Sequence, residues 1–254
     1  MLFLPYKILE GNIKIPPFQR NFVWKKEQVI DLLDSIIQGY PIGSILFWET
    51  KETLPAKRNI GSFLLPESEE DYPIKYVLDG QQRITSIFSV FCFDLKKESD
   101  ENVNSDTFDI HFDISTEKFI SNTKDFSGKS FPLKLLFDNF NFNKYIVNFS
   151  KEEVEIAVKV QSIFQNYDLP IVTIKKRDKS EVGIIFERIN NTGTKLSILD
   201  LMTAWTWIED FHLKEEFEKI LEHLDQKNFS NITDKIILQC MSSIINKTTK
   251  TKNI

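Results

Sequence analysis

The sequence contains few of the residues that build disulfides or metal centres. Its 254 residues include only two cysteines and three histidines. Cys92 and Cys240 lie far apart in apolar surroundings, so we expect both to be buried, reduced thiols. The histidines, His111, His212 and His223, follow no recognised metal-binding pattern. Composition therefore argues against a disulfide framework and against a zinc site.

Glycine and long apolar runs are also scarce. Only eight glycines occur, so we expect each to stand where the backbone requires it. The longest apolar runs, such as residues 84–93, are interrupted and too short to cross a bilayer, and the N-terminus lacks a signal-peptide layout. No Walker P-loop, HExxH or GxSxG motif occurs. These absences predict a cytoplasmic protein with no membrane partner.

The abundant residue is phenylalanine, and its 22 copies predict a large apolar core. The chain is 41% hydrophobic and 27% charged, which is the balance of a soluble globular protein. Its formal net charge is -5 at pH 7. That charge argues against a surface that binds nucleic acid everywhere, but it leaves a local basic cleft open.

Hydrophobic periodicity divides the chain into a strand-rich first half and a helical second half. Short apolar or alternating runs predict strands at residues 13–17, 42–49, 76–78, 107–114 and 169–174. Helical spacing predicts helices at residues 26–38, 82–93, 150–166, 180–189, 198–211, 213–225 and 231–246. We therefore predict an α+β domain over residues 1–149 and a mainly helical region, packed on it, over residues 150–254. Residues 50–72 are expected to form a loop or an irregular insertion.

The most informative unit is a strand, a turn and a helix around the DGQQR segment that begins at Asp79. A helix N-terminus presents unpaired N–H groups and a positive dipole end, so it suits an anion such as phosphate. Gly80 permits a tight turn, and the Arg83 guanidinium offers a planar fork for phosphate oxygens. Asp79 is suited to a metal ion or a water, and the amide of Gln81 or Gln82 is suited to positioning an attacking water. The competing interpretation is structural, with Asp79 as an N-cap before a polar first turn.

Two further segments combine polar groups that suit a nucleotide. Gln19 and Arg20 lie in the aromatic segment 18–24, and an exposed arginine beside rings can stack on a base or bind phosphate. A turn rich in asparagine, threonine and glycine joins two predicted helices at residues 190–194, with Lys195 close by. Each segment also has a plain structural interpretation, as a surface arginine beside a core tryptophan and as an ordinary connection between helices. The residues alone leave both interpretations open.

Four segments, taken in order, resemble the N-terminal domain of GmrSD-type restriction endonucleases. They are residues 15–24, 39–45, 78–83 and 186–197, and the resemblance extends over nearly the whole chain. It implies a mixed core similar to the ParB/sulfiredoxin fold, followed by the helical region. It also implies nucleotide binding and hydrolysis around the DGQQR motif, with a divalent metal, and a role in defence against phage DNA that carries modifications.

The resemblance also assigns candidate site residues. The catalytic candidates match the DGQQR motif and are Asp79, Gln81, Gln82 and Arg83. Asp79 is in addition the candidate metal ligand, for an ion that we expect to be Mg²⁺. The nucleotide-binding candidates match the motif glycine, an early QR pair and a late loop, and are Gly80, Gln19, Arg20, Arg188, Asn190, Thr192, Gly193 and Lys195. We expect these three stretches to enclose one hollow.

The leading functional hypothesis is a nucleoside triphosphatase that regulates a DNA nuclease. GTP is one candidate substrate, although the sequence shows no base-reading code. Members of the family often carry an HNH-type nuclease domain, and no such motif occurs here. We therefore expect a nuclease domain or subunit as partner. We expect no DNA cleavage by this chain alone. Whether the chain is truncated, a split-gene product or stand-alone stays open. The alternative is a nucleotide- or DNA-binding adaptor without turnover, and DNA binding and homo-oligomer formation also stay open.

Overall fold

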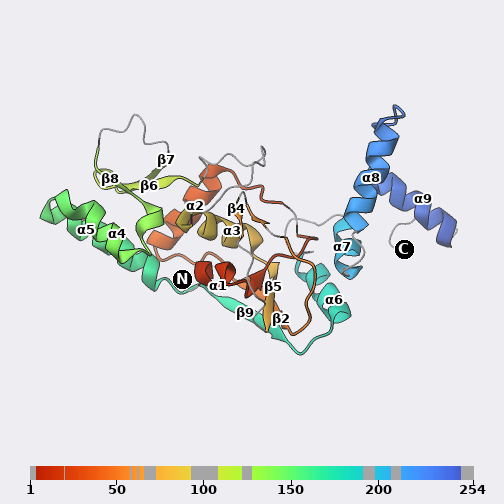
Figure 1. Ribbon diagram of the computed structural model, residues 1–254, viewed down its shortest axis with the longest axis horizontal. Helices are drawn as coiled ribbons and strands as arrows, with labels where there is room; N and C mark the ends of the chain where they lie inside the picture. The colour runs from red at the N-terminus through yellow and green to blue at the C-terminus, as the bar shows by residue number, and fades with distance from the viewer. Residues whose placement is uncertain are drawn as a thin grey trace. The chain divides into compact units, whose positions relative to one another are not determined.

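The structure is a computed structural model whose described residues fall into two compact units (Figure 1). It describes residues 4–19, 21–57, 59–61, 63–65, 73–92, 108–121, 128–190, 198–206 and 213–246. The first unit comprises Met1–Ile15, Asn21–Lys51 and Lys57–Ile174. The second comprises Pro16–Arg20, Glu52–Ala56 and Lys175–Ile254. The domain division predicted at residue 149 stays a prediction.

A four-stranded mixed sheet, in the order β1-β5-β2-β9, is the largest sheet of the first unit. β1 (Ile13–Lys14) runs parallel to β5 (Ile74–Asp79), whereas β2 (Ile45–Thr50) runs antiparallel to it. β9 (Ile171–Lys175) lies beside β2 at the edge. Four of the predicted strands are thereby confirmed, with ends that differ by a few residues. Mixed sheets beside helices confirm the α+β fold class.

The two inner strands, β2 and β5, are buried on both faces. Successive side chains along a strand point to opposite sides of a sheet. Ile45, Phe47 and Val77 lie on one side in the main core, and each is at most 1% exposed. On the other side Trp48 pairs with Tyr76 across the strands, with ring centroids 6.0 Å apart. Burial on both faces explains why these strands appear in the sequence as continuous apolar runs.

α2 (Lys26–Ile37) confirms a predicted helix together with its stop signal. Its buried residues are those whose spacing predicts it: Val29, Leu32, Leu33 and Ile36. Gly39 follows in a left-handed conformation with φ +69°, and its N–H donates to Ile36 O at 3.0 Å. The N–H of Tyr40 donates to Ser35 O at 2.8 Å. These two bonds satisfy the last carbonyls of the helix, and the left-handed residue that they need is most readily a glycine.

α5 (Lys151–Asn166) begins at the predicted capping box. The N–H of Glu153 donates to Ser150 Oγ at 3.3 Å, and the N–H of Ser150 donates to the Glu153 carboxylate at 2.6 Å. Lys129 Nζ donates to the same carboxylate at 2.6 Å, and this bond is the main cause of a lowered pKa for Glu153. Two otherwise unpaired N–H groups are thereby satisfied, which favours helix formation at this position.

Several elements of the first unit lie where the sequence predicts a loop or nothing definite. β3 (Asn59–Ile60) and β4 (Phe63–Leu64) form a hairpin within the expected loop at residues 50–72. β6 (Ile110–Asp113), which lies in a predicted strand, pairs with β7 (Lys118–Ser121) and β8 (Ser130–Pro132). The short helices η3 (Leu133–Leu135), α4 (Asn139–Tyr145) and η4 (Ile146–Asn148) follow. These strands have two to four residues and the helices three to seven, which is too short to show a period, so hydrophobic spacing does not reveal them.

Phenylalanines form much of the core of the first unit, as their abundance predicts. Phe91, at the end of α3 (Gln81–Phe91), lies edge-on to Phe137 and Phe164, with centroid distances of 4.7 and 5.6 Å. Phe131 lies edge-on to Phe142 at 5.4 Å. Edge-to-face contacts at these distances stabilise a core beyond the area that they bury. α1 (Leu4–Leu9) contributes Leu4 and Ile8 to the same core.

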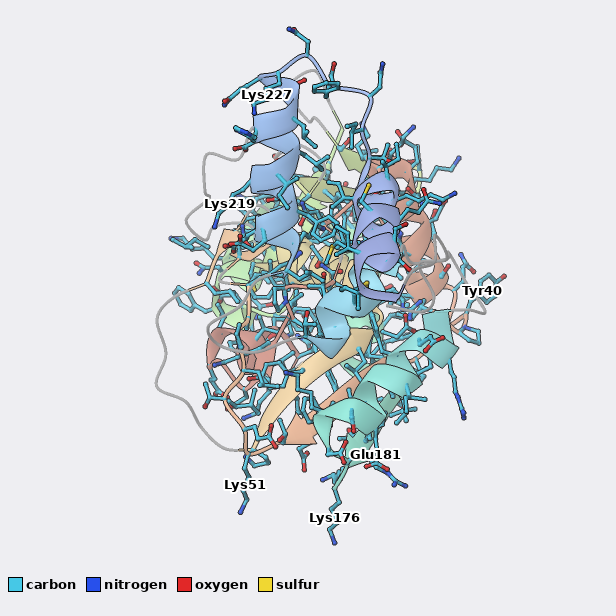
Figure 2. All side chains as sticks on the ribbon, turned by 90° about the vertical axis from the view of Figure 1, so that its right-hand side faces the viewer. Tyr40, Lys51, Lys176, Glu181, Lys219 and Lys227 are labelled. Atoms are coloured by element: carbon cyan, nitrogen blue, oxygen red, sulfur yellow. The ribbon has the colours of Figure 1, made fainter. Side chains whose placement is uncertain are left out.

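The second unit is helical, as predicted for the end of the chain. Its helices are α6 (Lys179–Asn190), α7 (Ile198–Trp205), α8 (Leu213–Asp225) and α9 (Asp234–Asn246). α7, α8 and α9 each contribute buried side chains to one small apolar cluster. Its buried members are Leu199, Leu213, Phe217 and Leu238. On α8, Lys219 projects from the helix and pairs with Glu216 at 2.7 Å (Figure 2). In the N-terminal segment of this unit, Phe18 packs on Phe186 of α6 with centroids 4.8 Å apart.

The structure corrects the prediction for one cysteine. Cys92 is partly buried, whereas Cys240 on α9 is exposed. Cys240 comes two residues after Leu238, a buried residue of α9 in the small core, and a step of two residues turns a helix to nearly its opposite side. The apolar neighbourhood in the sequence therefore does not imply burial. No helix in the described residues is both long enough and apolar enough to cross a membrane.

The two thiols should react at very different rates in the native protein. Burial raises the pKa of Cys92 to about 12, so almost no thiolate is present at neutral pH. We expect iodoacetamide to label exposed Cys240 at least about 100-fold faster than Cys92, because the thiolate is the nucleophile. Mass spectrometry of timed samples measures both rates, and labelling in denaturant provides the control. Equal labelling rates in the native protein would contradict the burial of Cys92.

Candidate functional site

The DGQQR segment lies where β5 ends and α3 begins, as predicted. Asp79 is the last residue of β5, and Gly80 is the N-cap of α3 with φ 87° and ψ 14°. The interpretation of Asp79 as the N-cap is therefore wrong, because the helix begins one residue later. Among the described residues, no side chain caps this helix end. The first N–H groups of α3 consequently have the unpaired character that an anion site uses.

An irregularity in the sheet lies directly before the motif. Leu46 pairs with Asp79 and Phe47 pairs with Val77, so the register between β2 and β5 skips Leu78. A bulge of this kind bends the strand and redirects the side chains next to it, and bulges are common beside active sites. Here it changes the direction of the chain one residue before the Asp79 carboxylate and two residues before the left-handed turn.

The Arg83 guanidinium lies between two glycines that adopt left-handed conformations. Its Nη2 donates to Ser44 O at 2.8 Å and to Asp79 Oδ2 at 3.3 Å. A Cβ built on Gly43, where φ is +81°, would lie 3.3 Å from Arg83 Nη1. A Cβ built on Gly80 would lie 3.2 Å from Arg83 Nη2 and 2.6 Å from Ile45 Cδ1. Both positions favour glycine because of their left-handed backbone, and a Cβ at either would fit tightly against the arginine.

The pair of charged side chains is accessible to a ligand. The Asp79 side chain is 44% exposed and the Arg83 side chain is 22% exposed. Arg83 Nε is buried and has no hydrogen-bond partner within the described part of the chain. The guanidinium therefore keeps donor capacity beyond the bonds to Ser44 and Asp79, since it carries five N–H groups. An exposed carboxylate and a part-exposed guanidinium at a helix N-terminus together suit a metal-bound phosphate.

The two glutamines of the motif have different environments, although each is 7% exposed. Gln82 Oε1 accepts hydrogen bonds from the N–H of Val23 at 2.9 Å and of Trp24 at 3.3 Å. Gln82 Nε2 donates to Asn21 O at 3.1 Å. Its amide thus holds the backbone of residues 21–24 against the start of α3. Gln81 Oε1, by contrast, is buried without a hydrogen-bond partner among the described residues.

Replacing Gln82 with alanine should destabilise the first unit by about 2–4 kcal/mol, since three hydrogen bonds of about 1 kcal/mol each are lost and their backbone partners are left unpaired. Urea denaturation measures the change. Gln161→Ala is the matched control, because Gln165 Nε2 donates to the same Leu136 O and Asn139 Oδ1 as Gln161 does. Equal losses in the two variants would refute the assigned role of Gln82.

The other predicted site residues belong to the second unit or lie outside the described residues. Gln19 is buried, and its N–H donates to Pro16 O at 3.1 Å. Arg188 is exposed in the last turn of α6, and Asn190 is the final residue of that helix. The predicted site residues outside the described part of the chain are Arg20, Thr192, Gly193 and Lys195. Their convergence with the DGQQR motif therefore stays a prediction.

Sequence reasoning missed three groups that position the motif. Gly43 and the carbonyl of Ser44 surround the Arg83 guanidinium, and the backbone of residues 21–24 receives Gln82. The scarcity of glycine was a usable signal for Gly43, since each of only eight glycines is expected to have a conformational purpose. No sequence pattern could have indicated the two backbone contacts, because a carbonyl or an N–H is present at almost every residue.

Asp79 is the candidate metal ligand at this site, and it supplies one carboxylate. No group of three or more histidine, cysteine, aspartate or glutamate residues that could hold a metal occurs among the described residues. One carboxylate together with phosphate oxygens and waters is a usual ligand set for Mg²⁺ at a nucleotide. The residues present fit such an ion only in the company of a phosphorylated ligand.

Two comparisons with known proteins found similar sequences. The chain is 29% identical, over 265 residues, to the uncharacterized protein MJ0686 of Methanocaldococcus jannaschii, and the alignment covers 91% of this chain. It covers only 45% of that relative, so the chain spans less than half of the relative's length. A family model described as "GmrSD restriction endonuclease, N-terminal domain" matches residues 5–207. Because this match covers well over half of the chain, the protein belongs to the family of GmrSD restriction endonuclease N-terminal domains.

Proposed function

We propose that this chain binds a nucleoside triphosphate at the N-terminus of α3 and hydrolyses it. The observation that carries the proposal is the position of the Arg83 guanidinium between Gly43 and Gly80, at a helix end that no described side chain caps. Backbone N–H groups, the helix dipole and a guanidinium there favour the same negatively charged group. A phosphate chain fits these donors better than a neutral ligand does.

Asp79 and Arg83 would act together on the phosphates. In the structure the carboxylate partly neutralises the guanidinium at 3.3 Å. A bound Mg²⁺ would supply charge neutralisation for the phosphate oxygens, and Asp79 would hold it. With its charge directed to the cation, Asp79 no longer neutralises Arg83, and the guanidinium can turn its N–H groups to a phosphate oxygen. Gly80 leaves the space that this turn requires.

Of the two glutamines, Gln81 is the better candidate for orienting the attacking water. The Gln82 amide is already bonded to the backbone of residues 21–24. Gln81 Oε1 has no partner among the described residues, so it retains the acceptor that a water proton needs. This division assigns Gln82 to positioning and Gln81 to the reaction, although the sequence alone treats the two side chains alike.

Family membership supports a wider role in a restriction system. The matched family model is described as the N-terminal domain of a restriction endonuclease, which supports regulation of a DNA nuclease by the nucleotide state of this chain. The proposed partner is an HNH-type nuclease domain or subunit, acting on phage DNA that carries modifications. GTP is the first substrate to test, and the ParB/sulfiredoxin-like character of the core belongs to the same proposal.

The second candidate is a nucleotide- or DNA-binding adaptor without turnover. One observation favours it: the Gln82 amide, a group suited to orienting water, is occupied by backbone bonds. Both candidates share the phosphate-binding chemistry of Arg83 and the first turn of α3. They differ only in whether phosphate is released.

The deciding experiment measures phosphate release from ATP, GTP, CTP and UTP with Mg²⁺, beside equilibrium binding of a non-hydrolysable analogue of each. Multiple turnovers that stop when the Mg²⁺ is chelated would support the hydrolase. Binding of an analogue without phosphate release would support the adaptor instead. If the chain neither binds nor hydrolyses any of the four, both candidates are wrong.

A further inference from the structure

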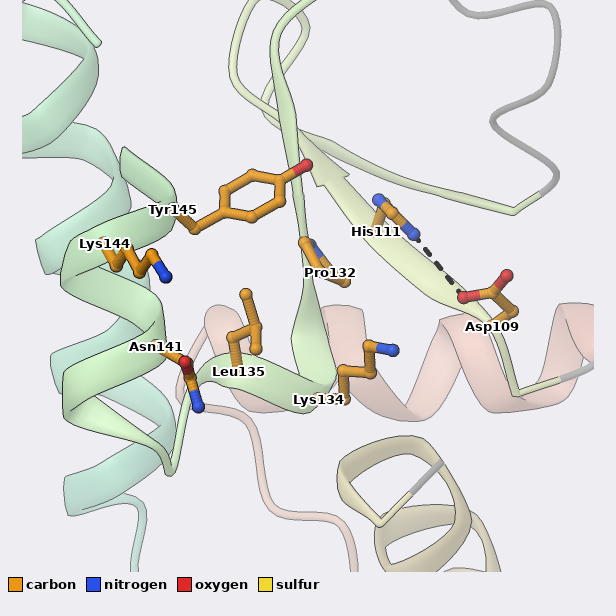
Figure 3. Close-up of a pocket in the computed structure, with 8 residues that line it drawn as sticks. All are labelled: Asp109, His111, Pro132, Lys134, Leu135, Asn141, Lys144 and Tyr145. Carbon is orange, nitrogen blue, oxygen red and sulfur yellow. Dashed lines mark ion pairs between the residues drawn. The ribbon is translucent and has the colours of Figure 1, made fainter. Parts of the chain in front are cut away.

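Two features of the first unit lie outside the proposed site. One is a cavity of about 750 Å³ formed by β6, β8, η3 and α4, in which the Asp109 carboxylate pairs with His111 Nε2 at 3.5 Å (Figure 3). In Figure 3 the Lys134 and Lys144 side chains do not meet at one point, so the cavity indicates no particular ligand. The other feature is the outer edge of the four-stranded sheet, which ends at β9 (Figure 1).

The backbone of β9 presents an edge that no described strand covers. The carbonyl of Pro170 accepts a hydrogen bond from the N–H of Ile45 on β2 at 2.9 Å, so the backbone groups of Pro170 face β2. Backbone groups alternate in direction along a strand, so those of Ile171 and Thr173 face away from β2. Outward N–H and C=O groups of this kind are a template for another strand.

The side chains of β9 leave this edge open. Residues 171–174 include no charge and no proline, which are the features that commonly block the edge of a sheet. Ile171 and Val172 point to opposite faces of the sheet, and each is 51% exposed. Exposed apolar side chains on both faces of an edge strand favour pairing with another chain. The edge therefore indicates a partner that is itself an extended strand.

Two charged side chains flank the strand at equal distances. Asp168 lies four residues before Val172, and Lys176 lies four residues after it. Both are exposed, and neither side chain has an ion pair within the described part of the chain. Lys176 projects away from the ribbon in Figure 2. Its φ of 55° ends the strand, so its charge reaches a partner through a long, flexible side chain.

We propose that β9 pairs with β9 of a second copy of this chain, in antiparallel orientation about a twofold axis through Val172. In this register Val172 faces its own copy, and Ile171 exchanges backbone N–H···O bonds with Thr173 of the other copy. Asp168 of each copy then lies opposite Lys176 of the other, whereas a parallel pairing would bring like charges together. The two four-stranded sheets become one continuous sheet.

Backbone bonds and apolar contacts supply the affinity of this pairing, and the charges select its register. Exposed ion pairs contribute little to binding, but like charges in a wrong register oppose it. A short strand edge buries little surface, so we expect a reversible equilibrium in which the dimer increases with protein concentration. Sedimentation equilibrium of the full chain measures it. A monomer at every concentration up to about 1 mM would overturn the proposal.

Single cysteines test the register directly, in a Cys240→Ser background that removes the exposed native thiol. Val172→Cys should form a disulfide between copies on mild oxidation, because the facing Cα atoms would lie about 4.5 Å apart. Ile171→Cys is the matched control, since Ile171 is equally exposed but its two copies would lie about 8 Å apart, too far for a disulfide. Equal cross-linking of the two variants, or none at position 172, would refute this register.

Charge reversal tests the partner without altering the strand. Asp168→Lys and Lys176→Asp should each weaken self-association about tenfold, because opposite charges across the interface become like charges. A mixture of the two variants restores opposite charges at both ends, so a heterodimer should form with the affinity of the unaltered dimer. Lys159→Asp on α5 is the control, because Lys159 is exposed and lies outside the proposed interface.

The charge variants also define what would contradict the pairing. Self-association that neither reversal changes places the interface elsewhere on the chain. Self-association that each reversal weakens, without recovery in the mixture, shows that Asp168 and Lys176 do not face each other across a twofold axis. Circular dichroism establishes that each variant is folded. None of these measurements uses a nucleotide, so they do not depend on the proposed triphosphatase site.

Discussion

Replacing Arg83 with alanine is expected to reduce phosphate release from the nucleotide by about 100-fold or more, because a preorganised charge that faces the transferring phosphate is removed. The fold should persist, since the side chain is partly exposed and its hydrogen bonds within the described part of the chain go to two groups, Ser44 O and Asp79. The measurement is the turnover rate with Mg²⁺ at saturating triphosphate. Circular dichroism and the unfolding midpoint in urea establish whether the variant is folded.

Two further variants make the Arg83 result specific. Arg83→Lys keeps one positive charge but loses the planar fork, so we expect a partial loss of turnover. Arg177→Ala is the matched control, because Arg177 pairs with a carboxylate four residues away, Glu181, as Arg83 pairs with Asp79, but lies outside the motif. Its turnover should equal that of the unaltered chain. A folded Arg83→Ala variant with undiminished turnover would remove the proposed hydrolase mechanism.

The second large effect is on stability. Gly80→Ala should lower the free energy of unfolding by about 2–4 kcal/mol, from left-handed strain of about 1–2 kcal/mol together with a steric overlap. The overlap is with Ile45 Cδ1, which would lie 2.6 Å from the new Cβ, so the buried Ile45 side chain must shift. Because the same Cβ would lie 3.2 Å from Arg83 Nη2, phosphate release should fall as well. Urea denaturation and the turnover assay measure the two consequences.

Gly39→Ala is the control that separates strain from overlap. Gly39 has φ +69°, and no described atom would lie within 4 Å of its Cβ. It should therefore show only the backbone penalty of about 1–2 kcal/mol. It should also leave turnover unchanged, since it lies before β2 and away from the guanidinium. If the two alanine variants lose the same stability, crowding at Gly80 contributes nothing and the close fit around Arg83 is not a requirement of the fold.

Much of the fold was predictable because its signals are local. The buried stripe of α2 and the glycine that ends it lie within residues 26–39, and the two partners of the capping box at Ser150 are three residues apart. The pairing of β3 with β4 and the short helices after β8 were not predictable in this way. Gly61 illustrates the difference: its Cβ would lie 3.0 Å from Thr85 Cγ2 on α3, a contact between segments far apart in the chain.

The candidate site shows the same division. Its location at the junction of β5 and α3, and the chemistry of Asp79 and Arg83, follow from residue types and their spacing. The sequence could not separate Gln81 from Gln82, because an amide's hydrogen-bond partners depend on which backbone lies beside it. In the structure that backbone is residues 21–24, about sixty residues earlier in the chain.

The sequence by itself determined the α+β class, the strand and helix that carry the motif, and the residue types at the helix end. Only the tertiary structure decided that Gly80 rather than Asp79 caps α3, that Gly43 and Ser44 surround the guanidinium, and that Gln82 serves as a backbone clamp. The physical reason is range. Periodicity and capping act between neighbours a few residues apart, whereas hydrogen bonds and steric fit at the site join segments that meet only when the sheet forms.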